Sequence, residues 1–109
     1  MRWLWEGALD RDLTGCHLAL NAGCDINLTG HGQTTPLYIA CFKGHLDIVR
    51  LLLENNCNID QAMDDGRMPL YAACNQEHLD IVRLLLENKC NIDQAMDDDG
   101  RTLVYTPLT

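Results

Sequence analysis

Residues 36–65 read PLYIACFKGHLDIVRLLLENNCNIDQAMDD, and residues 69–98 read PLYAACNQEHLDIVRLLLENKCNIDQAMDD. The two stretches are 33 residues apart and agree at 25 of 30 positions. A weaker copy precedes them, because residues 18–27 align with residues 51–60 and keep the leucines, the cysteine and the isoleucine. A fixed period of this length is typical of a solenoid, in which each unit leaves an apolar face that its neighbour covers. The sequence therefore predicts a stack of about three units.

Each unit is expected to begin with a short helix. Thr35 offers a hydroxyl that caps free backbone N–H groups, and Pro36 suits the first helical position because its missing N–H is not needed there. Gly44 can adopt the left-handed conformation that ends the helix, and His45 then opens a second helix.

The second helix is followed by a polar, turn-rich segment. Asp47 and Arg50 stand three residues apart and are expected to form a solvated ion pair. Asn55-Asn56 ends the helix, and Asp65-Gly66 favours a tight reversal between short extended arms. The apolar stripe of this helix comprises Leu46, Val49, Leu52 and Leu53.

These motifs resemble the ankyrin repeat. Residues 35–41 stand where that family has Thr-Pro-Leu-His and paired small residues, residues 44–46 match its Gly-His turn, and residues 57–60 are similar to its Ala-Asp-Val-Asn. The resemblance covers residues 30–101 well and residues 3–29 loosely. It implies an all-α solenoid with short β-hairpin turns, an L-shaped stack that is non-catalytic and binds another protein through its hairpin tips and inner helices.

The resemblance also implies how the chain is divided. Residues 1–109 form a single ankyrin repeat domain, made of a divergent N-terminal capping repeat (1–29), two repeats (30–62 and 63–95) and a partial repeat or C-terminal tail (96–109). Trp3 and Trp5 either cover the first unit as part of its cap or anchor a partner, since terminal units need atypical faces and tryptophan is favoured at interface centres.

The second of the similar copies departs from the family pattern. Tyr71, like Tyr38, replaces the family histidine, Met68 replaces the capping threonine, and Glu77 stands where the first copy has Gly44. A lost cap and a non-glycine residue in the left-handed region each cost about 1 kcal/mol. We therefore expect the second copy to be the looser one.

Composition excludes several classes of function. The 109 residues carry a formal net charge of −8, contain no serine, and have no lysine or arginine run that could follow a phosphate backbone. Serine-nucleophile chemistry and nucleic acid binding are therefore not expected.

The apolar runs are too short to span a membrane, and charged residues interrupt the N-terminus before a secretory signal can form. These features predict an intracellular protein, cytoplasmic or nuclear.

The cysteines follow the repeat. Cys24, Cys57 and Cys90 share one unit position, which separates neighbouring sulfurs by a packing layer of about 8–10 Å, beyond the reach of a disulfide. We expect reduced core residues and no cofactor. A metal site is the weaker reading because no Cys-x-x-Cys pair exists and the histidines have no zinc-type spacing. The acidic residues 97–100 could suggest a calcium site, but the sequence lacks the bidentate glutamate that an EF-hand requires. The remaining catalytic alternative depends on a reactive Cys16 or His17.

The differences between the two similar copies point to the contact surface. Four of the five fall in the first helix or at its end: Ile39/Ala72, Phe42/Asn75, Lys43/Gln76 and Gly44/Glu77. The alternative is neutral drift on an exposed face. The expected partner-binding residues combine the helix positions with the hairpin tips: Ile39, Phe42, Lys43, Asp64, Asp65, Arg67, Ala72, Asn75, Gln76, Asp97, Asp98 and Arg101.

Charge indicates the kind of partner. The expected hairpin tips are acidic and the chain has a net charge of −8. Both favour a partner protein with a basic surface, because complementary charge raises the association rate. A structural role is the alternative function. The helix expected over residues 79–87 has an outward apolar face that a following unit would bury, so the chain is then part of a longer array or self-associates through its uncovered C-terminal end.

Overall fold

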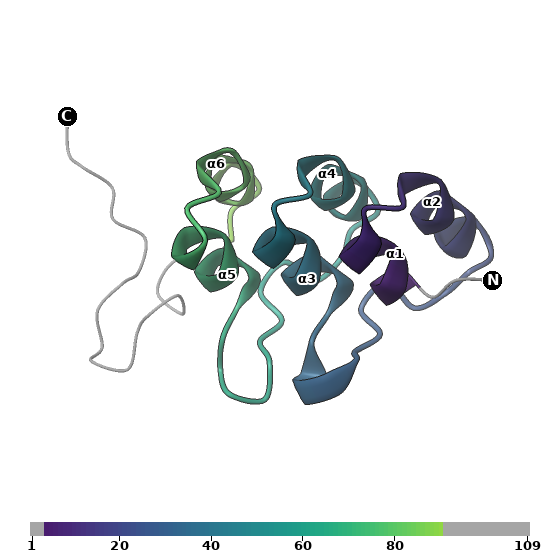
Figure 1. The fold of residues 1–109 in the computed structure, drawn as a ribbon, viewed down its shortest axis with the longest axis horizontal. Helices are drawn as coiled ribbons and strands as arrows, with labels where there is room; N and C mark the ends of the chain where they lie inside the picture. Colours follow the sequence, from purple (N-terminus) through teal and green to yellow (C-terminus); the bar gives the residue numbers. More distant parts are fainter. Residues whose placement is uncertain (1–3, 91–109) are drawn as a thin grey trace.

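A computed structural model describes residues 4–90 of the chain. Its helices are α1 (Leu4–Asp10), α2 (Leu13–Asn21), α3 (Pro36–Lys43), α4 (Leu46–Glu54), α5 (Pro69–Asn75) and α6 (Leu79–Glu87), with a short 3-10 turn, η1 (His31–Gln33). Figure 1 shows two rows of helices, an inner row of α1, α3 and α5 and an outer row of α2, α4 and α6. The all-helical solenoid expected from the repeat is confirmed.

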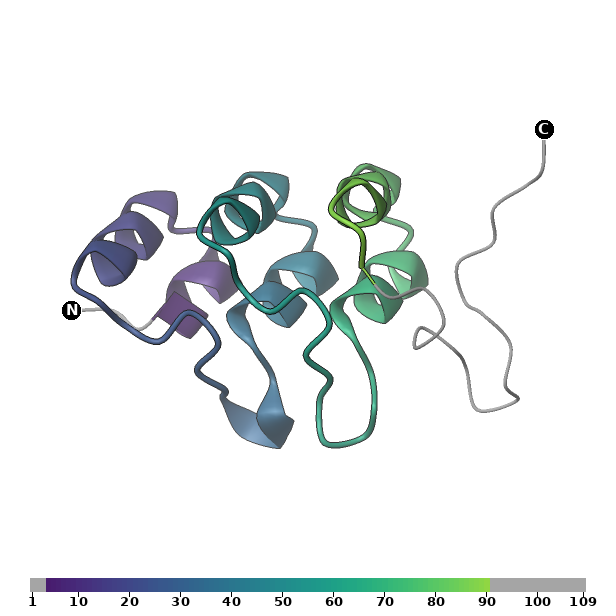
Figure 2. The ribbon, with the colours of Figure 1, turned by 180° about the vertical axis from the view of Figure 1, so that it is seen from behind.

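Two loops join the helix pairs. Loop A (residues 22–35) connects α2 to α3, loop B (residues 55–68) connects α4 to α5, and both project beyond the inner row, as Figure 2 shows from behind. The tight turn expected in loop B is present: Gly66 has a φ of 90°, and its N–H donates to the Met63 oxygen at 3.0 Å. The arms are joined by the Met63 N–H to the Arg67 oxygen at 2.7 Å, and no β-strand forms within residues 4–90.

The ends of α3 form as the sequence predicts. Thr35 has extended backbone angles, and its side-chain oxygen accepts the Tyr38 N–H at 3.0 Å. At the other end Gly44 takes a left-handed φ of 80°, and its N–H donates to the Ala40 oxygen at 2.9 Å. The cap and the glycine therefore fix where α3 begins and ends.

The ends of α5 differ in the way the departures predict. Met68 precedes α5 without a side-chain capping bond, and Glu77 has a left-handed φ of 59°. However, the Met68 side chain is only 1% exposed and adds apolar contacts to the core. Burial of this side chain offsets part of the loss of the cap.

The core lies between the two rows. In α3, Leu37, Ala40 and Cys41, which stand three and four residues apart, are buried. The apolar face of α4 is wider than the predicted stripe, because Ile48 and Leu51 are buried as well. α4 needs this second face since it packs against α2 and α6 in addition to α3.

Polar contacts also join neighbouring repeats. The Nδ1 atom of His45 lies 2.8 Å from the Ala8 oxygen, and Nε2 of His78 lies 3.2 Å from the Phe42 oxygen. The two histidines are therefore structural hydrogen-bonding groups. The predicted pair between Asp47 and Arg50 is wrong: Oδ2 of Asp47 lies 3.5 Å from Nε of Arg11, in the preceding repeat.

One apolar unit position of the outer row is half-buried in the first two repeats and exposed in the third. Leu13 lies beside a cavity of about 200 Å³ between α2 and α4, and Leu46, its counterpart one repeat on, is also half-buried. Leu79, the next counterpart, is 73% exposed on α6. Among the described residues, then, no helix covers this side of α6. Within the same residues, no helix is long and apolar enough to cross a membrane.

Candidate functional site

The inner row presents most of the predicted helix positions to solvent. Phe42 is 38% exposed, while Lys43, Asn75 and Gln76 are exposed and Ile39 is half-buried. Ala72 is an exception, because it is only 1% exposed and belongs to the core. The third helix pair therefore lacks the half-buried isoleucine side chain that the second pair has at this unit position.

Phe42 is held by an aromatic neighbour. The rings of Phe42 and Tyr38 stack with their centroids 6.5 Å apart and an angle of 16° between their planes. Tyr38 is buried, and this burial raises the pKa of its hydroxyl above the ordinary value. Because the buried Tyr38 ring packs against it, the Phe42 side chain already has limited freedom before binding and loses little when a partner binds.

The tip of loop B carries the predicted acidic residues. Asp64 is exposed, and its N–H donates to the Gly32 oxygen at 3.0 Å, which ties loop B to loop A. Asp65 turns back into its own loop, since one carboxylate oxygen accepts the Arg67 N–H at 3.0 Å and the other lies 3.4 Å from the Arg67 Nε. The Asp64 carboxylate therefore lies beside Gly32 of loop A, whereas the Asp65 carboxylate is bound to Arg67.

Arg67 holds loop B against the inner row. Its guanidinium lies over the Tyr71 ring, 5.2 Å from the centroid, in cation–π geometry. The side chain remains exposed, so it can also face a partner. Of the predicted site residues, Asp97, Asp98 and Arg101 lie outside the described residues, as does Trp3.

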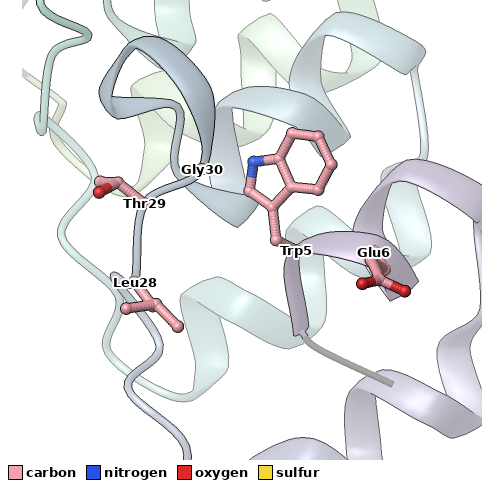
Figure 3. Close-up of a pocket in the computed structure, with 5 residues that line it drawn as sticks. All are labelled: Trp5, Glu6, Leu28, Thr29 and Gly30. Atoms are coloured by element: carbon pink, nitrogen blue, oxygen red, sulfur yellow. The ribbon is translucent and has the colours of Figure 1, made fainter.

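Sequence reasoning missed a pocket beside Trp5. A cavity of about 350 Å³ lies between α1 and loop A, lined by Trp5, Glu6, Leu28, Thr29 and Gly30 (Figure 3). Trp5 is half-buried. It occupies the same unit position as Tyr38 and Tyr71, so each helix pair carries one aromatic residue at this position. The 33-residue period, extended back to the first helix, was the signal that could have located this site.

The thiols are arranged as core residues. None of the six cysteines, all of which lie within residues 4–90, forms a disulfide, and Cys16 is fully buried at the unit position that Val49 occupies in the next repeat. Burial raises the pKa of Cys57 to about 12 and that of Cys90 to about 11, which suppresses the nucleophilic thiolate at neutral pH. No cluster of histidine, cysteine or carboxylate groups within residues 4–90 could hold a metal ion.

The comparison with known families covers nearly the whole chain. A family model described as ankyrin repeats (3 copies) matches residues 4–104. No curated protein sequence matches the chain.

Proposed function

The chain belongs to the ankyrin repeat family, and we propose that it binds a protein partner through the exposed positions of the inner row and the tips of the loops. Ankyrin repeats are in general protein–protein interaction modules and are typically non-catalytic. The observation that carries the proposal is the exposed Phe42 ring, which stacks on a buried tyrosine next to an acidic loop. Aromatic side chains that lose little freedom on binding are favoured as interface anchors.

The partner surface is basic. The chain has a net charge of −8, and Asp64 stands exposed at the tip of loop B. Complementary charges steer two proteins together and lose their effect as salt screens them. The binding surface also includes Asp97, Asp98 and Arg101, which follow one repeat after the tip of loop B in the sequence.

Association kinetics test this proposal. The partner is first isolated from the native source by affinity capture, and its association rate is then measured at low and high salt. Reversal of Asp64 and Asp65 to lysine should lower the association rate at low salt about tenfold and abolish most of its salt dependence. The reversal of Glu54 and Glu87 to lysine, both exposed on the outer row, is the control matched in charge. An association rate that the reversal of Asp64 and Asp65 leaves unchanged at low salt contradicts the acidic-tip proposal.

A second candidate function is structural: the chain forms part of a longer array or self-associates. Its basis is Leu79, which is 73% exposed although its counterpart Leu46 is half-buried within an identical helix sequence. Light scattering separates this candidate from the first. A dimer that Leu79→Glu dissociates supports self-association, whereas a monomer at all concentrations contradicts it.

The proposed location is intracellular, cytoplasmic or nuclear. Six cysteines within residues 4–90 that form no disulfide, with Cys16 and Cys41 fully buried, suit a reducing compartment. Imaging the tagged chain in its native cells tests this assignment.

A further inference from the structure

We propose that the cavity beside Trp5 is an anchor site, which takes an apolar side chain from a basic segment of the partner protein. The inference rests on the proposed function and deepens it, because it names where the partner is held and what chemistry the held segment has. The cavity measures about 350 Å³, within the range of about 300–1,000 Å³ that ligand pockets occupy.

The cavity arises from a difference between repeats. Gly30 of loop A shares its unit position with Met63 of loop B, whose side chain is half-buried and packs on the core. A side chain at Gly30 would meet Trp5, since a Cβ built there lies 2.8 Å from the indole Nε1. Trp5 and glycine therefore replace the tyrosine and methionine of the next repeat, the indole packs where a side chain at position 30 would lie, and the cavity remains beside the ring.

The lining specifies the occupant. Leu28 is 39% exposed at the cavity, and with the Trp5 ring it provides the apolar walls that an aliphatic or aromatic side chain requires. Glu6, at the unit position of Ile39 and Ala72, places an exposed carboxylate on the same lining. A lysine or arginine next to the apolar side chain satisfies this charge, in keeping with the net charge of −8.

The Trp5 indole packs tightly against loop A. Its Nε1 is buried, and Figure 3 shows the nitrogen side of the ring turned toward Gly30. The loop therefore covers the nitrogen, and the apolar part of the ring is left to contact the occupant. An extended peptide segment that carries an apolar side chain next to a basic one meets the requirements of this lining.

Selected peptides provide the probe. Random dodecapeptides are selected on the full chain, and the affinity of the tightest binder is measured by fluorescence anisotropy. We expect it to contain an apolar residue next to lysine or arginine. Glu6→Gln and Leu28→Ala should each weaken binding about tenfold, because each removes one contact to the occupant. Glu87→Gln and Leu18→Ala, exposed acidic and apolar positions on the outer row, should change affinity less than twofold.

The outcomes separate the anchor site from the proposed function. Binding that Phe42→Ala abolishes but Glu6→Gln and Leu28→Ala leave unchanged overturns the anchor site and leaves the proposed function standing. Binders without a basic residue overturn the chemistry assigned to the site. If neither a peptide nor a captured protein binds the chain, the proposed function fails as well. Both lining positions are exposed, so unchanged thermal unfolding of each variant verifies that the fold is intact.

Discussion

Replacement of Gly44 by alanine tests how the repeats are joined. Gly44 ends α3 with a φ of 80°, and a Cβ added there would lie 2.6 Å from the Cε1 atom of His78 in the next repeat. The substitution therefore strains the backbone and displaces the His78 ring. The Nε2 atom of this ring lies 3.2 Å from the Phe42 oxygen. A single methyl group thus perturbs both the end of a helix and a contact between two repeats.

The expected cost is the sum of two effects. An alanine in the left-handed region costs about 1–2 kcal/mol, and loss of the contact between His78 and Phe42 costs about 0.5–1.5 kcal/mol. We therefore expect Gly44→Ala to lower the free energy of unfolding by about 2–3 kcal/mol. Glu77→Gly, at the same unit position, should raise it by about 1 kcal/mol because it relieves the left-handed strain at a φ of 59°.

Urea denaturation followed by circular dichroism measures both effects. Gly44→Ala is compared in the native sequence and in the His78→Ala background, where the ring is absent. There it should cost only about 1–2 kcal/mol, which leaves a coupling energy of about 1 kcal/mol between the two positions. An equal cost in the two backgrounds would refute the proposed contact between Gly44 and the ring.

Three further predictions concern the cap, the thiols and the link between the first two repeats. Thr35→Val removes the acceptor of the Tyr38 N–H and should lower the melting temperature by about 4–8 °C in calorimetry, whereas Met68→Leu, at the uncapped counterpart, should change it much less. Burial raises the pKa of Cys57 to about 12 from 9.0, so the thiol loses its proton at lower pH in the unfolded state than in the folded state. The free energy of unfolding should therefore fall as pH rises above about 9. Urea titrations at pH 8 and 10 measure this fall, and Cys57→Val should reduce it. His45→Ala removes the 2.8 Å contact with the Ala8 oxygen and should increase amide hydrogen exchange in α1 more than in α5.

Periodicity and capping chemistry predict most of this fold because both are local. Thr35, Pro36 and Gly44 determine the bounds of α3 through interactions within a few residues of the chain. Contacts between repeats are less predictable. Asp47 pairs with Arg11, 36 positions earlier in the chain, because the stacking of repeats brings together residues that are distant in the sequence.

The candidate site was predictable where exposure follows the helix period. Phe42 and Lys43 lie on the surface as expected, but Ala72 is buried because a small side chain at that position does not reach solvent. The Trp5 cavity depends on three-dimensional packing of Gly30 against an indole from another element. The sequence contains the exchange of Met63 for Gly30, but the open space becomes evident only when the loop and α1 are placed together.

The most direct test of the central claim is amide chemical-shift mapping of the chain bound to its captured partner. We expect the largest shifts on the inner row and the loops, at residues such as Phe42, Lys43 and Asp64, together with Glu6 and Leu28 at the Trp5 cavity. Shifts confined to the outer row, on α2, α4 and α6, would contradict it.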